Sequence, residues 1–349
     1  MGKYSSLHFF STHWFPLPEI EPQDLSGRTV VVVGANVGLG LEAAKHFARM
    51  EPGKLVVVCR STQKCDDTAE EIHATTGFSR ISGYAVDLSV FASVIEFTEK
   101  FERDEKRLDI LVYNAGIAMP EYERTVDGYE QCIHVNNLSC MLLSTLLLPR
   151  MLETAKASGP NSPRPRLVVV ASGVHFWYTP SSDILSCERI LEKYNDPIYC
   201  SQPGVMATRY YLTKLLNVLF VRELAERLPS APIIASSVCP GLCKTSLGRN
   251  LRMPLFRSIG WKMYMGLLAR SAEMGSRSIV WTAVAASHRE QALHGHFTWN
   301  MEVQEESEFS VSKAGFAFQK KIWDETVQAL GQVSPRFKEI VDQYLPSPQ

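Results

Sequence analysis

Short apolar runs alternate with amphipathic stretches along most of the chain. Six runs rich in Val, Ile and Leu are typical of strands buried on both faces, and they cover residues 29–34, 55–59, 84–88, 109–114, 166–172 and 232–241. The clearest helical stretches cover residues 41–50, 90–103, 128–153 and 208–227. This alternation predicts right-handed βαβ units and a doubly wound parallel sheet with helices on both faces. We therefore expect a single α/β domain.

The two ends of the chain depart from this alternation. Residues 1–24 form an aromatic-rich arm, residues 25–300 hold the alternating domain, and residues 301–349 form a C-terminal helical extension, predicted as one amphipathic helix and a shorter one. His and Pro interrupt the arm, and no small-residue cleavage site follows, which argues against a secretory signal. Gly2 and Ser6 match a short N-myristoylation pattern, but an arm that packs on the domain is the favoured interpretation.

Composition narrows the classes of function. The 349 residues are 45% hydrophobic and carry a net charge of −1 without a long basic run, which argues against a nucleic-acid partner. The eight cysteines include no CxxC pair and several lie in apolar runs, as expected of reduced thiols inside a cell. No stretch is long enough for an uninterrupted membrane span. The sequence therefore predicts a cytoplasmic protein, and we expect no metal site.

The first predicted strand runs into a glycine-rich turn that opens the first helix. Its candidate cofactor-binding residues are Gly34, Asn36, Gly38, Leu39 and Gly40. Glycines let the backbone approach a pyrophosphate, and a helix N-terminus offers free N–H groups. A purely structural turn would also need glycine, but this position after the first strand favours a Rossmann-type dinucleotide loop.

Seven motifs in one order make the chain similar to the short-chain dehydrogenases/reductases, especially their retinol-dehydrogenase-like branch. They are GANVGLG at 34–40, Asp87 in VDLS, YNAG at 113–116, Asn136 in HVNNLS, Ser172 in VVVASG, Tyr210-x-x-x-Lys214, and Pro240-Gly241. The resemblance covers residues 25–300 and implies hydride transfer between a nicotinamide and a carbinol or carbonyl carbon. The C-terminal tail also resembles fungal members of this branch, many of which serve secondary-metabolite pathways.

Two adjacent tyrosines precede Lys214, and helical spacing alone does not choose between them. In this branch the YxxxK motif is followed by LxNVLF, and LLNVLF at residues 215–220 fixes the register. Tyr210 is therefore the predicted acid/base, and Tyr211 is predicted to be a packing residue.

The predicted catalytic set is Asn136, Ser172, Tyr210 and Lys214. A free tyrosine has a pKa of about 10, and a nearby ammonium favours the phenolate, so we expect Lys214 to lower the pKa of Tyr210. The resemblance implies that Lys214 also holds the nicotinamide ribose. It further implies that Ser172 donates a hydrogen bond to the substrate oxygen, and that Asn136 holds a backbone bend and a water that connects Lys214 to solvent.

Three features depart from the family pattern. Ala171 stands where the family usually has the first of two serines, which should be harmless. Asn137 and Ser139 stand where His and Gly are common, which we expect to alter local packing. The segment before Tyr210 is longer than usual, and its residues 175–206 predict a helical insertion at the rim of the substrate pocket.

The end of the second predicted strand indicates the cofactor. NAD enzymes usually carry an acidic residue there, whereas this chain has Arg60, followed by Lys64. A cation suits the 2′-phosphate of NADP, although an exposed arginine at a helix entry is the plainer alternative. We therefore predict NADP. The resemblance implies further contacts by Asp87 with the adenine, by Asn114 with the adenosine ribose, by Gly116, Pro240 and Gly241, and by Cys243 and Thr245 with the carboxamide and phosphate.

A predicted substrate lid covers residues 242–272, after the Pro-Gly motif. Its Met, Trp, Phe and Tyr content indicates a bulky, lipophilic small-molecule substrate. Basic residues flank the apolar ones, so peripheral membrane contact is a second interpretation that can coexist with the first. A homo-oligomer is compatible with the sequence.

The sequence thus predicts an NADP-dependent oxidoreductase that interconverts a ketone or aldehyde and an alcohol. The alternative is a non-catalytic NADP-binding sensor or scaffold of the same fold. Such degenerate members usually lose the tyrosine or the lysine, and this chain keeps all four catalytic positions. A sugar-nucleotide epimerase is disfavoured because those relatives generally use GxxGxxG spacing.

Overall fold

The computed structural model describes residues 16–159, 162–228, 232–245, 247, 266, 268–284 and 290–347. Within these residues the central feature is an eight-stranded sheet with the order β3-β2-β1-β4-β5-β6-β7-β8. Strands β1 to β7 are parallel, and β8 pairs antiparallel with β7. The strands are β1 Thr29–Val33, β2 Lys54–Cys59, β3 Ile81–Ala85, β4 Ile110–Tyr113, β5 Arg166–Val170, β6 Ile234–Cys239, β7 Phe297–Trp299 and β8 Glu302–Gln304. The predicted doubly wound α/β fold is confirmed.

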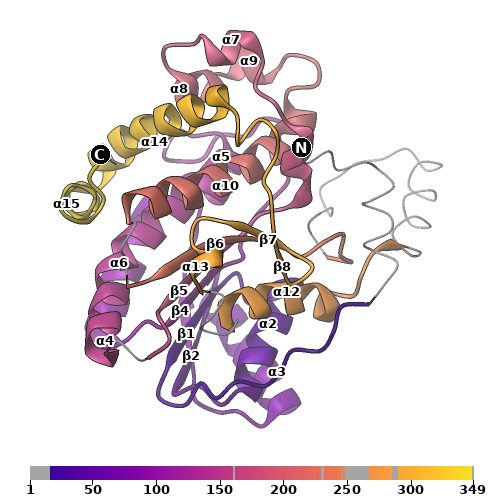
Figure 1. The fold of residues 1–349 in the computed structure, drawn as a ribbon, viewed down its shortest axis with the longest axis vertical. Coiled ribbons are helices and arrows are strands. Elements are labelled where there is room, and N and C mark those ends of the chain that lie inside the picture. The colour runs from indigo at the N-terminus through magenta and orange to yellow at the C-terminus, as the bar shows by residue number, and fades with distance from the viewer. Residues whose placement is uncertain are drawn as a thin grey trace.

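Helices cover both faces of the sheet (Figure 1). One face carries α2 Gly38–Arg49, α3 Thr62–Thr76 and α12 Ala272–Val284, and the other carries α4 Phe91–Asp104, α6 Ser139–Ser158 and α10 Arg209–Arg227. Because side chains alternate along a strand, β1 supplies both cores: Val31 and Val33 join one apolar cluster, and Val30 and Val32 join the other. Burial on both faces explains why this strand reads as a continuous valine run.

The C-terminal tail forms the predicted pair of helices. They are α14 Lys313–Val333 and α15 Pro335–Tyr344, which pack against α10 and α6 respectively. Phe318, Trp323 and Phe337 from these helices are buried in the same apolar cluster as the sheet. The extension is therefore part of one of the two cores.

One helical stretch passes from α5 Gln131–Ile133 through a π-helical turn, η1 His134–Leu138, into α6. The expectation that no stretch is long enough for a membrane span is wrong by length and composition, because among the described residues one stretch, 131–158, meets both criteria. However, 89% of its apolar window is buried inside the fold. Its composition is therefore explained by its position against the sheet.

The third strand lies earlier than predicted. The sequence placed it at residues 84–88, whereas β3 ends at Ala85. It is an edge strand in which Tyr84 is the buried residue. Val86 and Leu88, which suggested the strand, lie beyond its end and pack toward the apolar cluster on the α4 side.

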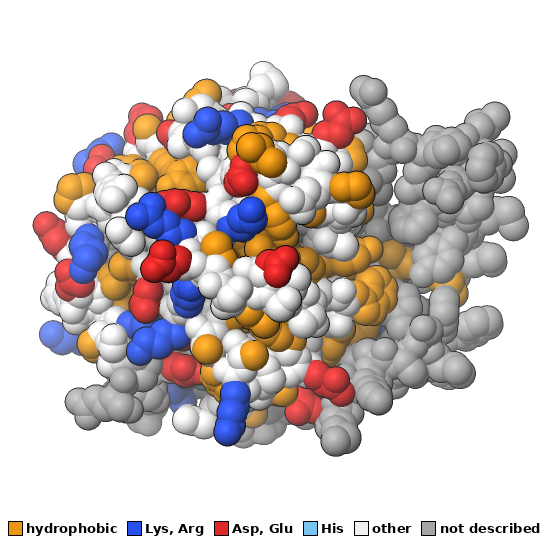
Figure 2. Space-filling view, turned by 90° about the horizontal axis from the view of Figure 1, so that it is seen from above, with side chains coloured by type: hydrophobic (Ala, Val, Ile, Leu, Met, Phe, Trp, Pro, Cys, Tyr) orange, Lys and Arg blue, Asp and Glu red, His pale blue; other side chains and the backbone are white. Residues whose placement is uncertain are grey.

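The segment between β5 and α10 is helical, as predicted, but its helices are short. They are η2 Gly173–Trp177, α7 Ser182–Leu185, α8 Ile190–Asn195, α9 Pro197–Cys200 and η3 Met206–Thr208. Trp177, Leu185 and Ile198 in this insertion are exposed. Seen from above, acidic and basic side chains are interspersed around such apolar ones (Figure 2). This face therefore has no large field of one sign.

Helix α2 approaches the end of β1 so closely that one position accepts only glycine. A Cβ on Gly40 would overlap the carbonyl oxygen of Gly34 and would lie 2.5 Å from Nδ2 of Asn114. Asn114 donates a hydrogen bond to that same carbonyl at 2.9 Å. The glycine-rich turn, the start of α2 and the end of β4 therefore form one closely packed unit.

We expect Gly40→Ala to destabilise the protein by at least the ~1–3 kcal/mol typical of overpacked sites, because the added methyl group meets backbone. The control is Gly331→Ala inside α14, where a Cβ would lie at an ordinary 3.5 Å from Lys338. That substitution should raise stability by about 0.5–1 kcal/mol. Thermal melting followed by circular dichroism measures both. A Gly40→Ala protein that melts like the wild type would contradict the packing argument.

Candidate active site

The strand order reverses direction between β1 and β4, because the chain winds outward from β1 through β2 to β3 and then returns. In open α/β sheets, ligands bind outside the carboxyl ends of the strands at such a reversal. The glycine-rich turn follows β1 at this point, and Asn114 and Gly116 follow β4. The structure thus brings these predicted residues to the carboxyl ends of two neighbouring strands.

Helix α10 carries Lys214 against the end of β5. Its ammonium donates a hydrogen bond to the carbonyl of Val170 at 2.7 Å, and the side chain is only 2% exposed. A Cβ on Gly116 would lie 3.5 Å from Nζ of Lys214 and 3.5 Å from Oδ1 of Asn136. Burial lowers the pKa of Lys214 to about 8, because a charged amine loses solvation there.

Tyr210 lies one turn before Lys214, and the ammonium is 5.5 Å from the centre of its ring. Burial raises the pKa of Tyr210 well above its ordinary value. The expectation that Lys214 lowers the pKa of Tyr210 is therefore wrong for the structure without cofactor. The ammonium of Lys214 is directed at the carbonyl of Val170 instead. Tyr211 packs edge-on against Trp177, with ring centres 5.9 Å apart, which matches its predicted packing role.

Asn136 lies in the π-helical turn and is completely buried. Its Oδ1 accepts a hydrogen bond from the Ile117 amide at 2.8 Å, and its Nδ2 donates to the Ile117 carbonyl at 2.9 Å. Nδ2 also donates to Oγ1 of Thr213 at 3.0 Å. Asn136 thus ties the loop after β4 to the residue that precedes Lys214.

Ser172 follows β5 two residues after Val170 and caps the short helix η2. Its Oγ accepts a hydrogen bond from the amide of Val174 at 3.4 Å, which leaves the hydroxyl hydrogen free to be donated. Its carbonyl accepts from Nδ1 of the buried His175 at 2.7 Å. Because Lys214 bonds to the end of the same strand, Ser172 lies at the same end of the sheet as the side chain of Lys214.

Cys239, at the end of β6, lies beside the candidate site and was not among the residues predicted from the sequence. Its sulfur accepts hydrogen bonds from the amides of Gly173 at 3.1 Å and Gly241 at 3.3 Å. It therefore joins the loop that carries Ser172 to the Pro240-Gly241 loop. The only signal in the sequence was its position directly before Pro-Gly.

Three charged residues, Arg60, Lys64 and Asp87, follow the neighbouring strands β2 and β3. Arg60 follows β2 and is exposed, as is Lys64 in the first turn of α3. Asp87 follows β3 and accepts two hydrogen bonds from Ser89, at 2.6 and 2.9 Å. Although burial opposes it, these bonds lower the pKa of Asp87, with a further contribution from the charge of Arg60.

Comparison with known proteins agrees with this geometry. Residues 28–174 match the short chain dehydrogenase family. The short chain dehydrogenase/reductase dmxR8 of Cryptosporiopsis sp. is 34% identical over 314 residues, which cover 89% of this chain and 92% of that protein. Retinol dehydrogenase 12 of Mus musculus is 33% identical over 261 residues, which cover 75% of this chain and 74% of that protein.

The chain belongs to the short-chain dehydrogenase/reductase family. The predicted resemblance to its retinol-dehydrogenase-like branch and to fungal members is confirmed. Among solved structures, L-sorbose reductase from Gluconobacter frateurii, complexed with NADPH and L-sorbose, has a TM-score of 0.58 at 19% identity. The match covers 80% of this chain and 97% of the reductase chain, so the two proteins share the same fold.

Short-chain dehydrogenases/reductases are oxidoreductases with a nicotinamide cofactor, and the residues of this chain fit such a group. The N-terminus of α2 has no side-chain cap at Val37 and no acidic residue in its first turn, so its N–H groups can receive a pyrophosphate. Gly38 has a φ of 59°, and among the described residues a Cβ there would first meet Thr245, at 3.8 Å. Asn36 and Leu39 complete this turn, and both are partly buried.

The predicted lid is described only at its two ends. The backbone of Lys244 donates to the carbonyl of Arg270 at 2.9 Å, and the amide of Arg270 donates to the carbonyl of Leu242 at 2.8 Å. These bonds form a short parallel bridge at Cys243. Residues 246, 248–265 and 267, and the predicted myristoylation site at Gly2, lie outside the described residues.

The pKa of Lys214 makes stability depend on pH. Its folded value of about 8 lies below the ordinary 10.5, so above pH 8 the unfolded chain keeps a proton that the folded protein loses. Wild-type stability should therefore gain up to roughly 3 kcal/mol between pH 8 and 10.5 from this group. Lys214→Met removes the buried charge, so without added cofactor it should be more stable than the wild type at pH 7. This advantage should shrink above pH 8 in chemical denaturation. A difference that stays constant from pH 7 to 10 would contradict the assignment.

Proposed function

We propose that this short-chain dehydrogenase/reductase is NADP-dependent and interconverts a ketone or aldehyde and an alcohol on a bulky, lipophilic substrate. The observation that carries the proposal is the arrangement around Lys214. Its buried ammonium lies between the ring of Tyr210 and the end of the strand that leads to Ser172. The nicotinamide would supply or accept the hydride.

The protein residues would handle the proton and the substrate oxygen. A phenol whose pKa is raised stays protonated at neutral pH, so Tyr210 is suited to donate a proton to the alkoxide formed on carbonyl reduction. Lys214, with a pKa of about 8, can give and take a proton near neutral pH. The free hydrogen of Ser172 would be donated to the substrate oxygen.

The cofactor preference is proposed from the charge at the end of β2. Arg60 is exposed there, and this strand end carries a cation in place of the carboxylate that would bind ribose hydroxyls. A guanidinium binds phosphate through planar, charge-assisted hydrogen bonds. NADPH in the L-sorbose reductase structure is compatible with this preference.

The substrate class is proposed from the insertion between β5 and α10. Trp177 is 55% exposed and lies five residues after Ser172, so it offers an apolar surface close to the proposed catalytic loop. The fungal relatives support a role in secondary metabolism. A cytoplasmic location, peripheral membrane contact and a homo-oligomer remain predictions from the sequence.

Replacing Tyr210 with phenylalanine tests the catalytic role. Tyr210→Phe should lower turnover of bulky ketones by roughly 10²–10⁴-fold, the usual contribution of general acid–base catalysis. Tyr211→Phe is the matched control and should keep most activity, because its ring still packs on Trp177. The measurement is NADPH consumption with a panel of bulky ketones and aldehydes. Near-normal activity in Tyr210→Phe would refute the role. Wild-type protein that binds NADPH but turns over no carbonyl would favour the non-catalytic alternative.

Reversing the charge at Arg60 tests the cofactor preference. A charge-assisted contact is worth about 1.5–3 kcal/mol, so Arg60→Asp should weaken NADPH binding by roughly ten- to over a hundredfold. NADH binding should stay unchanged or improve, because the new carboxylate can accept from ribose hydroxyls. Titration of both cofactors at low and raised salt measures this.

The control for net charge is Arg103→Asp, at an exposed position on α4. It should leave both affinities unchanged. Equal weakening of both cofactors by Arg60→Asp would mean that Arg60 supports the fold instead of reading the phosphate. Wild-type protein that binds NADH as tightly as NADPH would refute the preference.

A further inference from the structure

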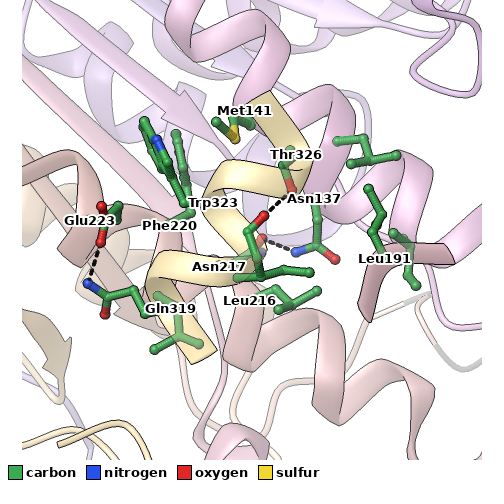
Figure 3. A pocket seen from close by; sticks show the side chains of 14 residues that line it. Asn137, Met141, Leu191, Leu216, Asn217, Phe220, Glu223, Gln319, Trp323 and Thr326 are labelled. Atoms are coloured by element: carbon green, nitrogen blue, oxygen red, sulfur yellow. Dashed lines mark hydrogen bonds between the residues drawn. The ribbon is translucent and has the colours of Figure 1, made fainter. Parts of the chain in front are cut away.

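A small cavity lies between α10 and the C-terminal helix α14 (Figure 3). Its volume is about 40 Å³. Most of its lining is apolar, but the amides of Asn137, Asn217 and Gln319 also border it. These three come from the π-helical turn, from α10 and from α14.

Hydrogen bonds fix how the two asparagine amides are turned. Nδ2 of Asn137 donates to the carbonyl of Thr213 at 2.7 Å and to Oδ1 of Asn217 at 2.6 Å. A carbonyl only accepts, so Asn137 must present its nitrogen to Thr213, and Asn217 must present its oxygen to Asn137. Oδ1 of Asn137 and Nδ2 of Asn217 are then buried without a partner among the described residues.

Gln319 adds a third buried polar atom without a partner among the described residues. Its Nε2 donates to Oε2 of Glu223 at 2.9 Å and to Oε1 of Glu226 at 3.3 Å, which fixes its orientation in the same way. Its Oε1 is buried without a partner in the described part of the chain. Residues with two such acceptors and one such donor therefore line one cavity, and buried polar atoms of this kind are normally hydrogen-bonded to protein or to ordered water. A volume of 40 Å³ is sufficient, since a water needs roughly 10–15 Å³ by the same measure.

The asparagine pair is also connected to the candidate catalytic residues. Asn136 and Asn137 follow each other in the π-helical turn and both hold Thr213, one at its hydroxyl at 3.0 Å and the other at its carbonyl at 2.7 Å. Thr213 directly precedes Lys214. Any change in how Asn137 holds Thr213 would therefore shift Lys214 relative to Asn136.

We propose that Asn137 and Asn217 are positioning residues that hold Lys214 and Asn136 in register through Thr213, and that water in the adjoining cavity completes their hydrogen bonds. Neither residue acts on substrate or cofactor directly. The inference rests on the proposed function for its kinetic consequence, but its structural part stands independently of turnover. The proposed water would connect α14 to the π-helical turn η1, which carries Asn136 and Asn137.

Two isosteric exchanges test the pair because they should behave differently. Position 217 needs an acceptor, so Asn217→Asp keeps the bond from Asn137, and kcat should stay within about threefold of the wild type. Position 137 needs a donor, so Asn137→Asp sets an oxygen against the Thr213 carbonyl. Its kcat should fall by about tenfold or more while the KM for the ketone changes little, because the catalytic groups are misplaced. Asn137→Leu, which adds no charge, should match Asn137→Asp.

The control is Thr326→Val, which borders the same cavity but donates its hydroxyl hydrogen within its own helix, to the carbonyl of Ile322 at 2.7 Å. Its kcat and KM should be unchanged. Equal losses in the two aspartate variants, or a rise in KM as large as the fall in kcat, would overturn the positioning role.

Hydrogen exchange followed by mass spectrometry gives a readout that does not need turnover. Residues 134–138 should exchange faster in Asn137→Asp and at the wild-type rate in Asn217→Asp. This comparison separates failure of the inference from failure of the proposed activity. A crystal structure of the full chain should show ordered water bonded to Nδ2 of Asn217. A dry cavity would overturn the water site.

Discussion

The burial of a single ammonium group is the constraint on which the arrangement at the strand ends depends. A charged amine removed from water is costly unless it is hydrogen-bonded, and the carbonyl of Val170 provides that bond to Lys214. The bond also fixes where α10 meets β5 and places Tyr210 one turn away. Asn136 then connects this helix to the loop after β4 through Thr213. The contact with Val170 thus sets the position of Lys214, and its burial lowers the pKa.

The two faces of the sheet contribute different parts of the proposed active site. The face with α2, α3 and α12 supplies the uncapped helix N-terminus and the cation after β2, which suit a phosphate-bearing cofactor. The face with α4, α6 and α10 supplies Asn136, Tyr210 and Lys214. The C-terminal helices cover this second face and belong to its core. Changes in α14 should therefore influence the catalytic helix more directly than changes in α3.

The fold was predictable because the central strands are buried on both faces, and such strands have continuous β-branched runs in the sequence, as at residues 29–34. Short strands and strands at the edge of the sheet have weaker sequence patterns. Sequence analysis placed β3 wrongly and missed β7 and β8, each of which has three residues. Motif order predicted the candidate residues at the strand ends. The contact of Cys239 with Gly173 and the contacts of Asn137 were not predictable, because these partners lie 66 and 76 or more residues away.

The bridge between Cys243 and Arg270 has a consequence for how the sequence of the predicted lid segment can change. It joins the two ends of the lid segment with main-chain hydrogen bonds, which do not depend on the side chains between them. Once the ends are held, the closure entropy grows slowly with length, and each doubling costs only about 0.6 kcal/mol. The bridge can therefore hold the ends of the predicted lid segment together for many sequences and lengths between them. Engineering can insert or exchange residues there while Tyr210 and Lys214 keep their contacts on α10.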